Sequence, residues 1–293
     1  MNQIAIIGPT ASGKSDLAIA YALKHNAYIL SIDSLSIYKE VNIVSAKPSK
    51  EELATVPHFG IDELFINEYF SVDIFIELYK KVVSTCKKEN KNLVIVGGTS
   101  FYLKTLLSGL SHLPQADEII RQKVRLELND IKKAYKKLLS IDPEYMTQIA
   151  QNDRYRIEKA LMILETTNTI PSQWFKQNPP KPIIQDLDIY EIKVKREILR
   201  QRIIQRTVKM LKNGLIDEVC FLERKYTRLP NPMKSIGIVE TLDYLDGKIN
   251  KKELEELIII HTAQLAKRQE TFNKSQFLHV KKSTFEELHK LFH

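Results

Sequence analysis

The sequence has 293 residues, of which 43% are hydrophobic and 27% are charged, as in an ordinary soluble protein with a sizeable core. No apolar run reaches the roughly 18 residues that a membrane span requires, so a transmembrane protein is excluded. The net charge of +8 favours a polyanionic partner such as a nucleic acid.

The first apolar run leads directly into a glycine-rich loop, which leaves no room for a signal peptide and favours a cytoplasmic protein. The two cysteines, Cys86 and Cys220, lack the spacing of a metal site, and both are expected to be free thiols.

The first hundred residues alternate short apolar runs with helical patterns. Strands are expected at 4–7, 28–32 and 93–96, with helices after the first strand and over 71–89. This alternation predicts an α/β fold with a parallel sheet covered by helices on both faces. In such sheets the binding site lies beyond the carboxyl ends of the strands, where Gly13, Asp33 and Thr99 are all expected.

The pattern changes near Pro114. Residues 118–170 are helical in pattern and rich in lysine, and the proline-rich stretch at 178–182 ends that run. A strand at 189–194, long helices over 196–225 and 251–274, and a short strand near 277–282 follow. We therefore predict an α/β core formed by 1–113 and 186–293, interrupted by a helical insertion at 114–185.

A phosphate-binding loop lies between the first strand and the first helix. Its sequence G-x-x-x-x-G-K-S occupies Gly8, Pro9, Thr10, Ala11, Ser12, Gly13, Lys14 and Ser15. Backbone N–H groups and the helix N-terminus attract a diphosphate, Lys14 adds a positive charge, and the Ser15 hydroxyl is a ligand for Mg²⁺. The loop alone does not specify ATP, and the apolar strand that ends in Gly97 and Gly98 lacks the aspartate of a standard ATPase.

Ten sequence blocks resemble the tRNA dimethylallyltransferase family, also called tRNA isopentenyltransferases. In chain order they are GPTASGKS (8–15), SIDSLSIY (31–38), SAKP (45–48), PHFGID (57–62), YFSVDIF (69–75), VGGTSFY (96–102), QNDRYRIEKAL (151–161), RQRIIQRTVKMLKNGLIDEV (200–219), KSIGIVE (234–240) and QLAKRQETF (264–272).

The resemblance implies a magnesium-dependent transfer of the dimethylallyl group from dimethylallyl diphosphate to the exocyclic amine of adenosine 37 of tRNA. The expected tRNAs read codons that begin with U. It also implies a fold like that of phosphate-loop nucleotide kinases, with a helical insertion domain that grips the anticodon stem. Nothing in the sequence requires more than a monomer.

The resemblance also assigns roles to individual residues. Asp33 is expected to be the general base, and Thr10 and Arg206 to hold the departing diphosphate beside Lys14. Ser15 is the expected magnesium ligand, whereas the role of Arg202 is left open. The residues expected along the tRNA are Asp33, Ser34, Leu35, Ser36, Thr99, Arg121, Tyr155, Arg156, Ile157, Glu158, Lys159, Lys234, Ser235, Ile236, Gly237, Ile238 and Val239.

Several residues depart from the common family pattern, namely Ser36, Lys159, Ile238, Ala263 and Phe272. These departures concern the expected tRNA contacts, whereas the phosphate-binding loop is intact. Two other functions remain open at this point. One is an ATP-dependent nucleotide or nucleoside kinase with the same loop, and the other is an RNA-binding protein without catalytic activity.

Overall fold

The computed structural model describes residues 1–292, which form two compact units. The first unit comprises 1–104 and 184–293, of which residues up to 292 are described, and the second comprises 105–183. The predicted insertion at 114–185 thus starts nine residues later, and ends two residues later, than the compact unit. The second unit starts within a helix that spans Ser100–Ser108. The composition change at Pro114 therefore does not mark the start of the unit.

The elements of the first unit, in chain order, are β1 Gln3–Ile7, α1 Lys14–Lys24, β2 Ala27–Ser31, α2 Lys50–Thr55, β3 His58–Phe59, α3 Val72–Lys88, β4 Asn92–Val96, α4 Ser100–Ser108, β5 Asp188–Ile192, α10 Arg196–Lys212, α11 Leu215–Tyr226, η2 Asn231–Lys234, α12 Ile238–Leu245, α13 Lys251–Gln276, β6 Lys281–Ser283 and α14 Phe285–Phe292. Helix α4 continues into the second unit.

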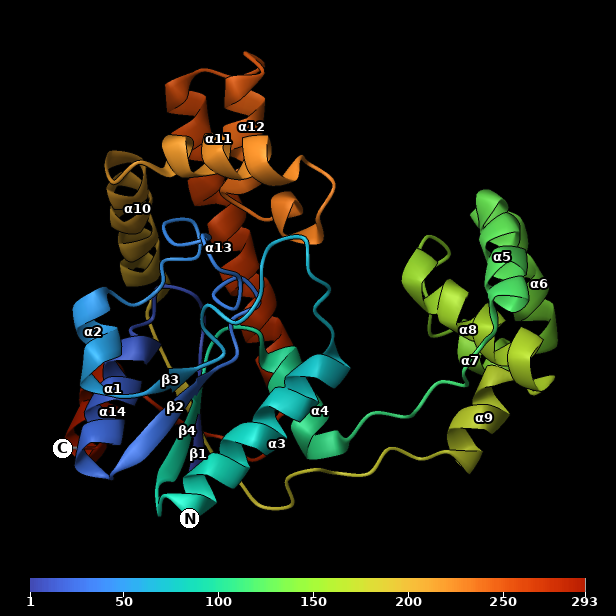
Figure 1. The fold of residues 1–293 in the computed structure, drawn as a ribbon, viewed down its shortest axis with the longest axis horizontal. Helices are drawn as coiled ribbons and strands as arrows, with labels where there is room; N and C mark the ends of the chain where they lie inside the picture. Colours follow the sequence, from blue (N-terminus) through green and yellow to red (C-terminus); the bar gives the residue numbers. More distant parts are fainter. Residues whose placement is uncertain (293) are drawn as a thin grey trace. The chain divides into compact units, whose positions relative to one another are not determined.

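A parallel sheet forms the centre of the first unit. Its strands are in the order β3-β2-β4-β1-β5-β6, and every pair is parallel. Helices α1 and α14 pack on one face through a buried cluster that includes Leu17 and Leu288. Helix α3 contacts β2 and β4 (Figure 1). The expected α/β fold with a parallel sheet is confirmed.

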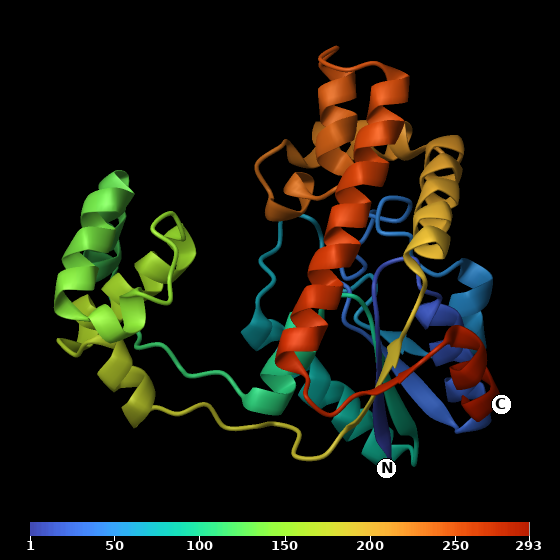
Figure 2. The same cartoon turned by 180° about the vertical axis from the view of Figure 1, so that it is seen from behind.

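A layer of helices lies beyond the carboxyl ends of the strands. Helices α11, α12 and α13 share a second core with the segment that follows β2, in which Val41 and Val44 pack against Leu215 and Ile258. Helix α10 packs along α13, which runs from the sheet into this layer (Figure 2). The layer therefore faces the edge of the sheet where a ligand is expected.

The single helix predicted over 196–225 is wrong, because the structure contains two helices there. Helix α10 ends at Lys212, and α11 begins at Leu215. Between them Gly214 has a φ of 97°, a left-handed conformation that glycine adopts without strain and that commonly ends a helix. The break gives α11 a direction of its own.

The second unit is helical. It contains α5 Glu118–Glu127, η1 Leu128–Asp130, α6 Ile131–Ile141, α7 Pro143–Met146, α8 Arg154–Thr167 and α9 Pro171–Gln177. Its own core includes Val124, Leu138 and Leu161, so apolar side chains of three helices stabilise the unit. Across residues 1–292, no helix combines the length and the apolar character needed to cross a membrane.

Candidate active site

The phosphate-binding loop connects β1 to α1, as the sequence predicts. Gly13 immediately precedes α1 with a φ of 91°, and a Cβ at this position would lie 2.9 Å from the Phe285 ring. Both the conformation and the close approach therefore favour glycine. The loop residues Thr10–Gly13 and the first turn of α1 line a cavity at the carboxyl edge of the sheet.

Lys14 is the first residue of α1, and its ammonium group donates a hydrogen bond of 2.6 Å to the carbonyl of Pro9. Burial, and after it the charge of Arg206, lower the pKa of Lys14 to about 7, while the charge of Asp33 acts in the opposite direction. The ammonium form is disfavoured because water is excluded and a second cation is close. An anion bound beside Lys14 would stabilise the ammonium form by its opposite charge and so oppose both effects.

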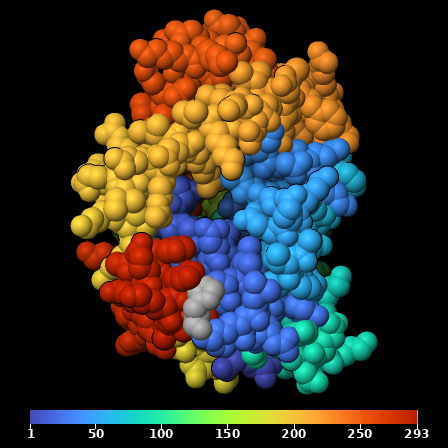
Figure 3. All heavy atoms as spheres, turned by 90° about the vertical axis from the view of Figure 1, so that its left-hand side faces the viewer, coloured from blue at the N-terminus to red at the C-terminus, as the bar shows by residue number. Residues whose placement is uncertain are grey.

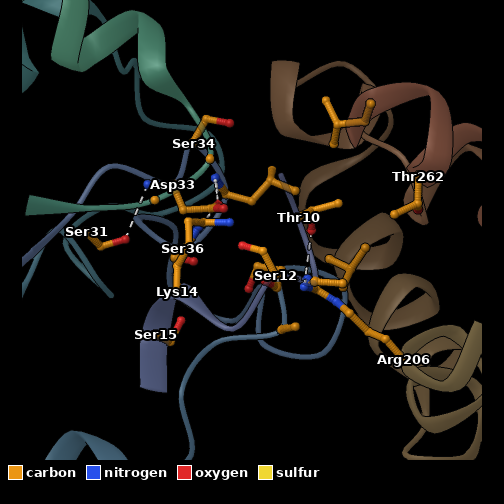
Figure 4. Close-up of a pocket in the computed structure, with 18 of the residues that line it drawn as sticks. Thr10, Ser12, Lys14, Ser15, Ser31, Asp33, Ser34, Ser36, Arg206 and Thr262 are labelled. Carbon is orange, nitrogen blue, oxygen red and sulfur yellow. Dashed lines mark hydrogen bonds between the residues drawn. The ribbon is translucent and has the colours of Figure 1, made fainter. Parts of the chain in front are cut away.

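Asp33 follows β2 and lines the same cavity (Figure 4). Its Oδ1 accepts hydrogen bonds from the backbone N–H groups of Leu35 at 2.8 Å and Ser36 at 3.1 Å. These bonds close a turn of the kind that aspartate forms readily, and they fix the direction of the carboxylate. Both of these bonds use Oδ1, so Oδ2 is the oxygen available to a substrate.

Arg206 reaches the loop from helix α10. Its guanidinium donates to the Thr10 hydroxyl at 3.3 Å and to the Ser45 carbonyl at 3.4 Å (Figure 4). Burial lowers the pKa of Arg206, and the carboxylate of Asp33 opposes that change. One turn earlier on the same helix, Arg202 donates to the Ser12 carbonyl at 3.2 Å. Arg206 therefore touches the Thr10 side chain, whereas Arg202 holds the backbone of the loop.

Gln269 of α13 was not singled out by the sequence analysis, although it lies within the block at 264–272. Its carbonyl oxygen accepts the Thr10 N–H at 2.8 Å, and its amide donates to the Gly98 carbonyl at 3.0 Å. The side chain thus ties the phosphate-binding loop to the turn after β4. A glutamine in a long helix gives no local signal for such a role.

The cavity has a volume of about 500 Å³ and is lined by residues of the first unit alone. A hollow between α10 and the N-terminal residues is visible on one face of the molecule (Figure 3). The residues predicted from the sequence that line the cavity are Thr10, Ala11, Ser12, Gly13, Lys14, Ser15, Asp33, Ser34, Leu35, Ser36, Arg206, Lys234, Ser235, Ile236 and Gly237. Residues that the prediction did not include also line it, among them Val44, Ser45, Ala46, His58, Thr262 and Gln269.

Other predicted residues of the first unit lie outside this lining. Thr99 accepts the Ser34 N–H on its hydroxyl at 3.2 Å and so supports the turn that carries Asp33. Ile238 is fully buried in the core of the helical layer, whereas Val239 is exposed. Gly8 and Pro9 belong to the loop but do not border the cavity, although the Pro9 carbonyl binds Lys14.

The remaining predicted residues belong to the second unit. Arg121 lies on α5, where its Nε donates to the Ala116 carbonyl at 3.1 Å. Helix α8 carries Tyr155, Arg156, Ile157, Glu158 and Lys159. Tyr155 and Arg156 are exposed, Glu158 and Lys159 are half-buried, and Ile157 is fully buried in the core of the unit. The charged side chains of this helix, rather than Ile157, are therefore accessible to a partner.

The described part of the chain contains no cluster of three or more His, Cys, Asp or Glu side chains that could hold a metal ion. Ser15 and Asp33 both line the cavity and supply oxygen atoms. Mg²⁺ commonly binds to one or two protein oxygens together with the phosphates of a substrate. These residues therefore fit an ion that is held largely by a bound diphosphate.

The fold and the site define a phosphate-loop α/β protein whose cavity is lined by the cations Lys14 and Arg206 and by the carboxylates of Asp16 and Asp33. Residues 36–276 match the model of the IPP transferase family, and the chain belongs to this family. A tRNA dimethylallyltransferase of Sulfurimonas denitrificans is 59% identical over 98% of this chain and 97% of that protein. A tRNA dimethylallyltransferase of a Sulfurovum species is 55% identical over 99% of this chain and 97% of that protein.

Solved structures agree with this assignment. A tRNA isopentenylpyrophosphate transferase of Bacillus halodurans is 28% identical with a TM-score of 0.73, over 99% of this chain and 94% of that chain. A tRNA delta(2)-isopentenylpyrophosphate transferase of Staphylococcus epidermidis is 30% identical with a TM-score of 0.71, over 100% and 96% of the two chains. A eukaryotic dimethylallyltransferase acting on tRNA shares the fold, with a TM-score of 0.84 at 24% identity over 98% of this chain and 75% of that chain.

Proposed function

We propose that the protein transfers the dimethylallyl group of dimethylallyl diphosphate to the exocyclic amine of adenosine 37 in tRNAs that read codons beginning with U. The observation that carries this proposal is the cavity in which Asp33 lies beside the phosphate-binding loop and Arg206. The names of the similar proteins support the same activity.

The loop and its neighbours supply what the leaving group needs. As the bond between the allylic carbon and the diphosphate oxygen breaks, its electron pair and negative charge pass to the diphosphate. The loop N–H groups, Lys14 and Arg206 place positive charge at that position before the reaction starts, which is the most effective form of electrostatic stabilisation. The Thr10 hydroxyl accepts a hydrogen bond from Arg206, so its own proton is available to a diphosphate oxygen.

Asp33 supplies what the acceptor needs. The adenine amine is a weak nucleophile because its lone pair is delocalised into the ring. When the amine nitrogen forms its bond to the allylic carbon, it must lose a proton, and Oδ2 of Asp33 is the acceptor we propose. The base must leave its stack to enter the cavity, as in other enzymes that modify a base. Lys234–Gly237 line the cavity and would border the extruded nucleotide.

Mg²⁺ fits this site through Ser15 and the oxygens of the diphosphate, as described above. When bound, it supplies additional positive charge to the leaving group. In the second unit, Arg121 and the exposed face of α8 suit the phosphates of the anticodon stem, which position a nucleic acid without reading its sequence. We further propose that the enzyme acts on tRNA as a monomer in the cytoplasm.

Purified protein with radiolabelled dimethylallyl diphosphate, Mg²⁺ and unmodified tRNA tests this proposal. We expect label in a tRNA that reads codons beginning with U and none in the same tRNA carrying guanosine at position 37. Transfer of label from ATP to a nucleotide or nucleoside, with no prenylation of tRNA, would establish the kinase alternative instead. Binding of tRNA without transfer of either label would indicate an RNA-binding protein.

The lowered pKa of Lys14 predicts that binding of dimethylallyl diphosphate takes up a proton. In the free site the pKa is about 7, and a diphosphate anion beside the amine raises it. Uptake therefore occurs above pH 7, approaching about one proton per site near pH 8, and the affinity falls as the pH rises further. Calorimetry in buffers of different ionisation enthalpy measures the number of protons taken up. We choose pH 8 to 9.5 because the phosphates of the donor are already ionised there. If Lys14→Met takes up as many protons as the wild type, Lys14 is not the group that binds the proton.

A further inference from the structure

One wall of the cavity is a segment without helix or strand, Val41–Lys47, which follows β2. Val44, Ser45 and Ala46 from this segment line the cavity. The Ser45 carbonyl accepts a hydrogen bond from Arg206. The position of this segment therefore affects the orientation of the Arg206 guanidinium, which faces the phosphate-binding loop. A segment of this kind needs partners for its backbone groups other than a helix or a sheet ladder.

Glu218 of α11 provides those partners for three consecutive N–H groups. Its Oε2 accepts from Asn42 at 3.0 Å and from Ile43 at 2.8 Å, and its Oε1 accepts from Ile43 and Val44, both at 3.0 Å. Both carboxylate oxygens are used, and each bond is strengthened by the negative charge of the acceptor. Helix α11 and the segment thus lie against each other, as Figure 3 shows for the light-orange and blue atoms.

Lys47 holds the other end of the segment. Its ammonium donates to the Tyr38 carbonyl at 2.6 Å, to Asn42 Oδ1 at 3.1 Å and to Asp62 Oδ1 at 2.6 Å, and its side chain is only 5% exposed. The Glu218 carboxylate therefore bonds the backbone of the segment, and Lys47 anchors its end through the ammonium group of its own side chain. This arrangement leaves the segment few alternative conformations.

The segment also meets residues 234–237, which line the cavity. A Cβ at Gly237 would lie 2.5 Å from Val44 Cγ2, so Val44 packs closely against the backbone there. Val44 and Ser45 therefore contact two parts of the site, the Gly237 backbone and the Arg206 guanidinium. A shift of the segment would be transmitted to both.

We propose that Glu218 is a positioning residue for the transfer reaction. Its carboxylate fixes the N–H groups of Asn42, Ile43 and Val44, and thereby sets the Ser45 carbonyl that orients Arg206 toward Thr10. This inference rests on the proposed function, because its readout is prenyl transfer. The break between α10 and α11 at Gly214 is part of the same arrangement, since it allows the first turn of α11 to meet the segment.

Glu218→Gln tests the inference at nearly constant size. The glutamine retains one acceptor oxygen and turns an NH₂ group toward backbone N–H donors, so part of the hydrogen bonding is replaced by repulsion between donors. We expect kcat/KM for dimethylallyl diphosphate to fall at least about tenfold, the range of losses that follow small displacements of catalytic groups. We expect the KM for tRNA to change little.

Glu40→Gln is the matched control. Glu40 accepts from Lys225 at 2.6 Å and so also links the region after β2 to α11, but it does not line the cavity. Both variants lose acceptor capacity between the same parts of the fold, and thermal unfolding measures the effect of each on stability. Only Glu218→Gln should lower kcat/KM for the donor. Equal donor kinetics in the two variants would overturn the inference.

A double-mutant cycle tests the route through Arg206. In an Arg206→Met background, Glu218→Gln should lower kcat/KM less than about twofold further, because the group it orients is gone. Fully multiplicative effects would overturn that route. If Glu218→Gln does not fold, Glu218→Asp replaces it in the comparison with Glu40→Gln. The shorter side chain keeps the negative charge but moves the carboxylate away from the N–H groups of the segment. A wild-type protein that transfers no prenyl group contradicts the proposed function, whereas an active wild type with unaffected Glu218 variants contradicts only this inference.

Discussion

Asp33→Asn is expected to lower kcat for prenyl transfer at least about a hundredfold, the usual loss when a general base is removed. The amide oxygen can still accept the N–H groups of Leu35 and Ser36, so the turn after β2 is retained. An amide cannot take the proton of the adenine amine at neutral pH. The variant therefore removes the proposed chemistry and keeps the proposed structure.

Asp33→Ala provides the comparison that separates the role of Asp33 as a general base from its role in holding the turn after β2. It loses both the basic oxygen and the turn, so it is also expected to lose at least about a hundredfold in kcat. Single-turnover measurements with saturating tRNA and dimethylallyl diphosphate give the rate of the chemical step for both variants. If Asp33→Asn transfers the prenyl group at nearly the wild-type rate while Asp33→Ala does not, the carboxylate has only a structural role.

The phosphate-binding loop and the parallel sheet could be predicted from the sequence because their signals are local. The spacing between Gly8 and Gly13-Lys14-Ser15 follows from the geometry of a turn between a strand and a helix. The position of Asp33 follows from the same reasoning, since the carboxyl ends of parallel strands meet at one edge. Each of these inferences needs only a few neighbouring residues.

Gln269 and Glu218 could not be predicted in the same way. Gln269 binds Thr10 across 259 positions of the chain, and Glu218 binds Asn42 across 176. Each lies in a helix of mixed polarity, where a polar side chain is ordinarily solvated. Their roles arise from the packing of the helical layer on the sheet edge, which no local pattern of residues contains.

The structure differs from the sequence-based predictions at two further places, and each difference has a physical cause. The apolar spacing of a helix continues across 196–225, and only the left-handed conformation of Gly214 interrupts it. Ile157 and Ile238 belong to blocks that the family resemblance places along the tRNA, yet both side chains are fully buried. Helical periodicity points some residues of any such block to the core. The tRNA contacts of the neighbouring charged residues stay a prediction.

Arg206→Met is expected to lower kcat/KM for dimethylallyl diphosphate by about a hundredfold to a thousandfold, as when one preorganised donor to a developing anion is removed. Arg206 donates to Thr10 and to Ser45 from two different nitrogen atoms. Arg206→Lys keeps the charge but loses the planar fork, so it should restore only part of the loss. Arg200→Met, on the exposed side of α10, is the control for the loss of an arginine from this helix.

The same substitution should change the proton uptake at Lys14, because the charge of Arg206 contributes to the low pKa of that amine. Without Arg206 the pKa of Lys14 rises, so the pH above which donor binding takes up a proton moves upward. Calorimetry with dimethylallyl diphosphate measures this midpoint independently of turnover. A fall in kcat/KM without a change of the midpoint would show that Arg206 and Lys14 do not act on the diphosphate through a shared electrostatic field. Equal kinetics in Arg200→Met and Arg206→Met would show that Arg206 has no role in the reaction.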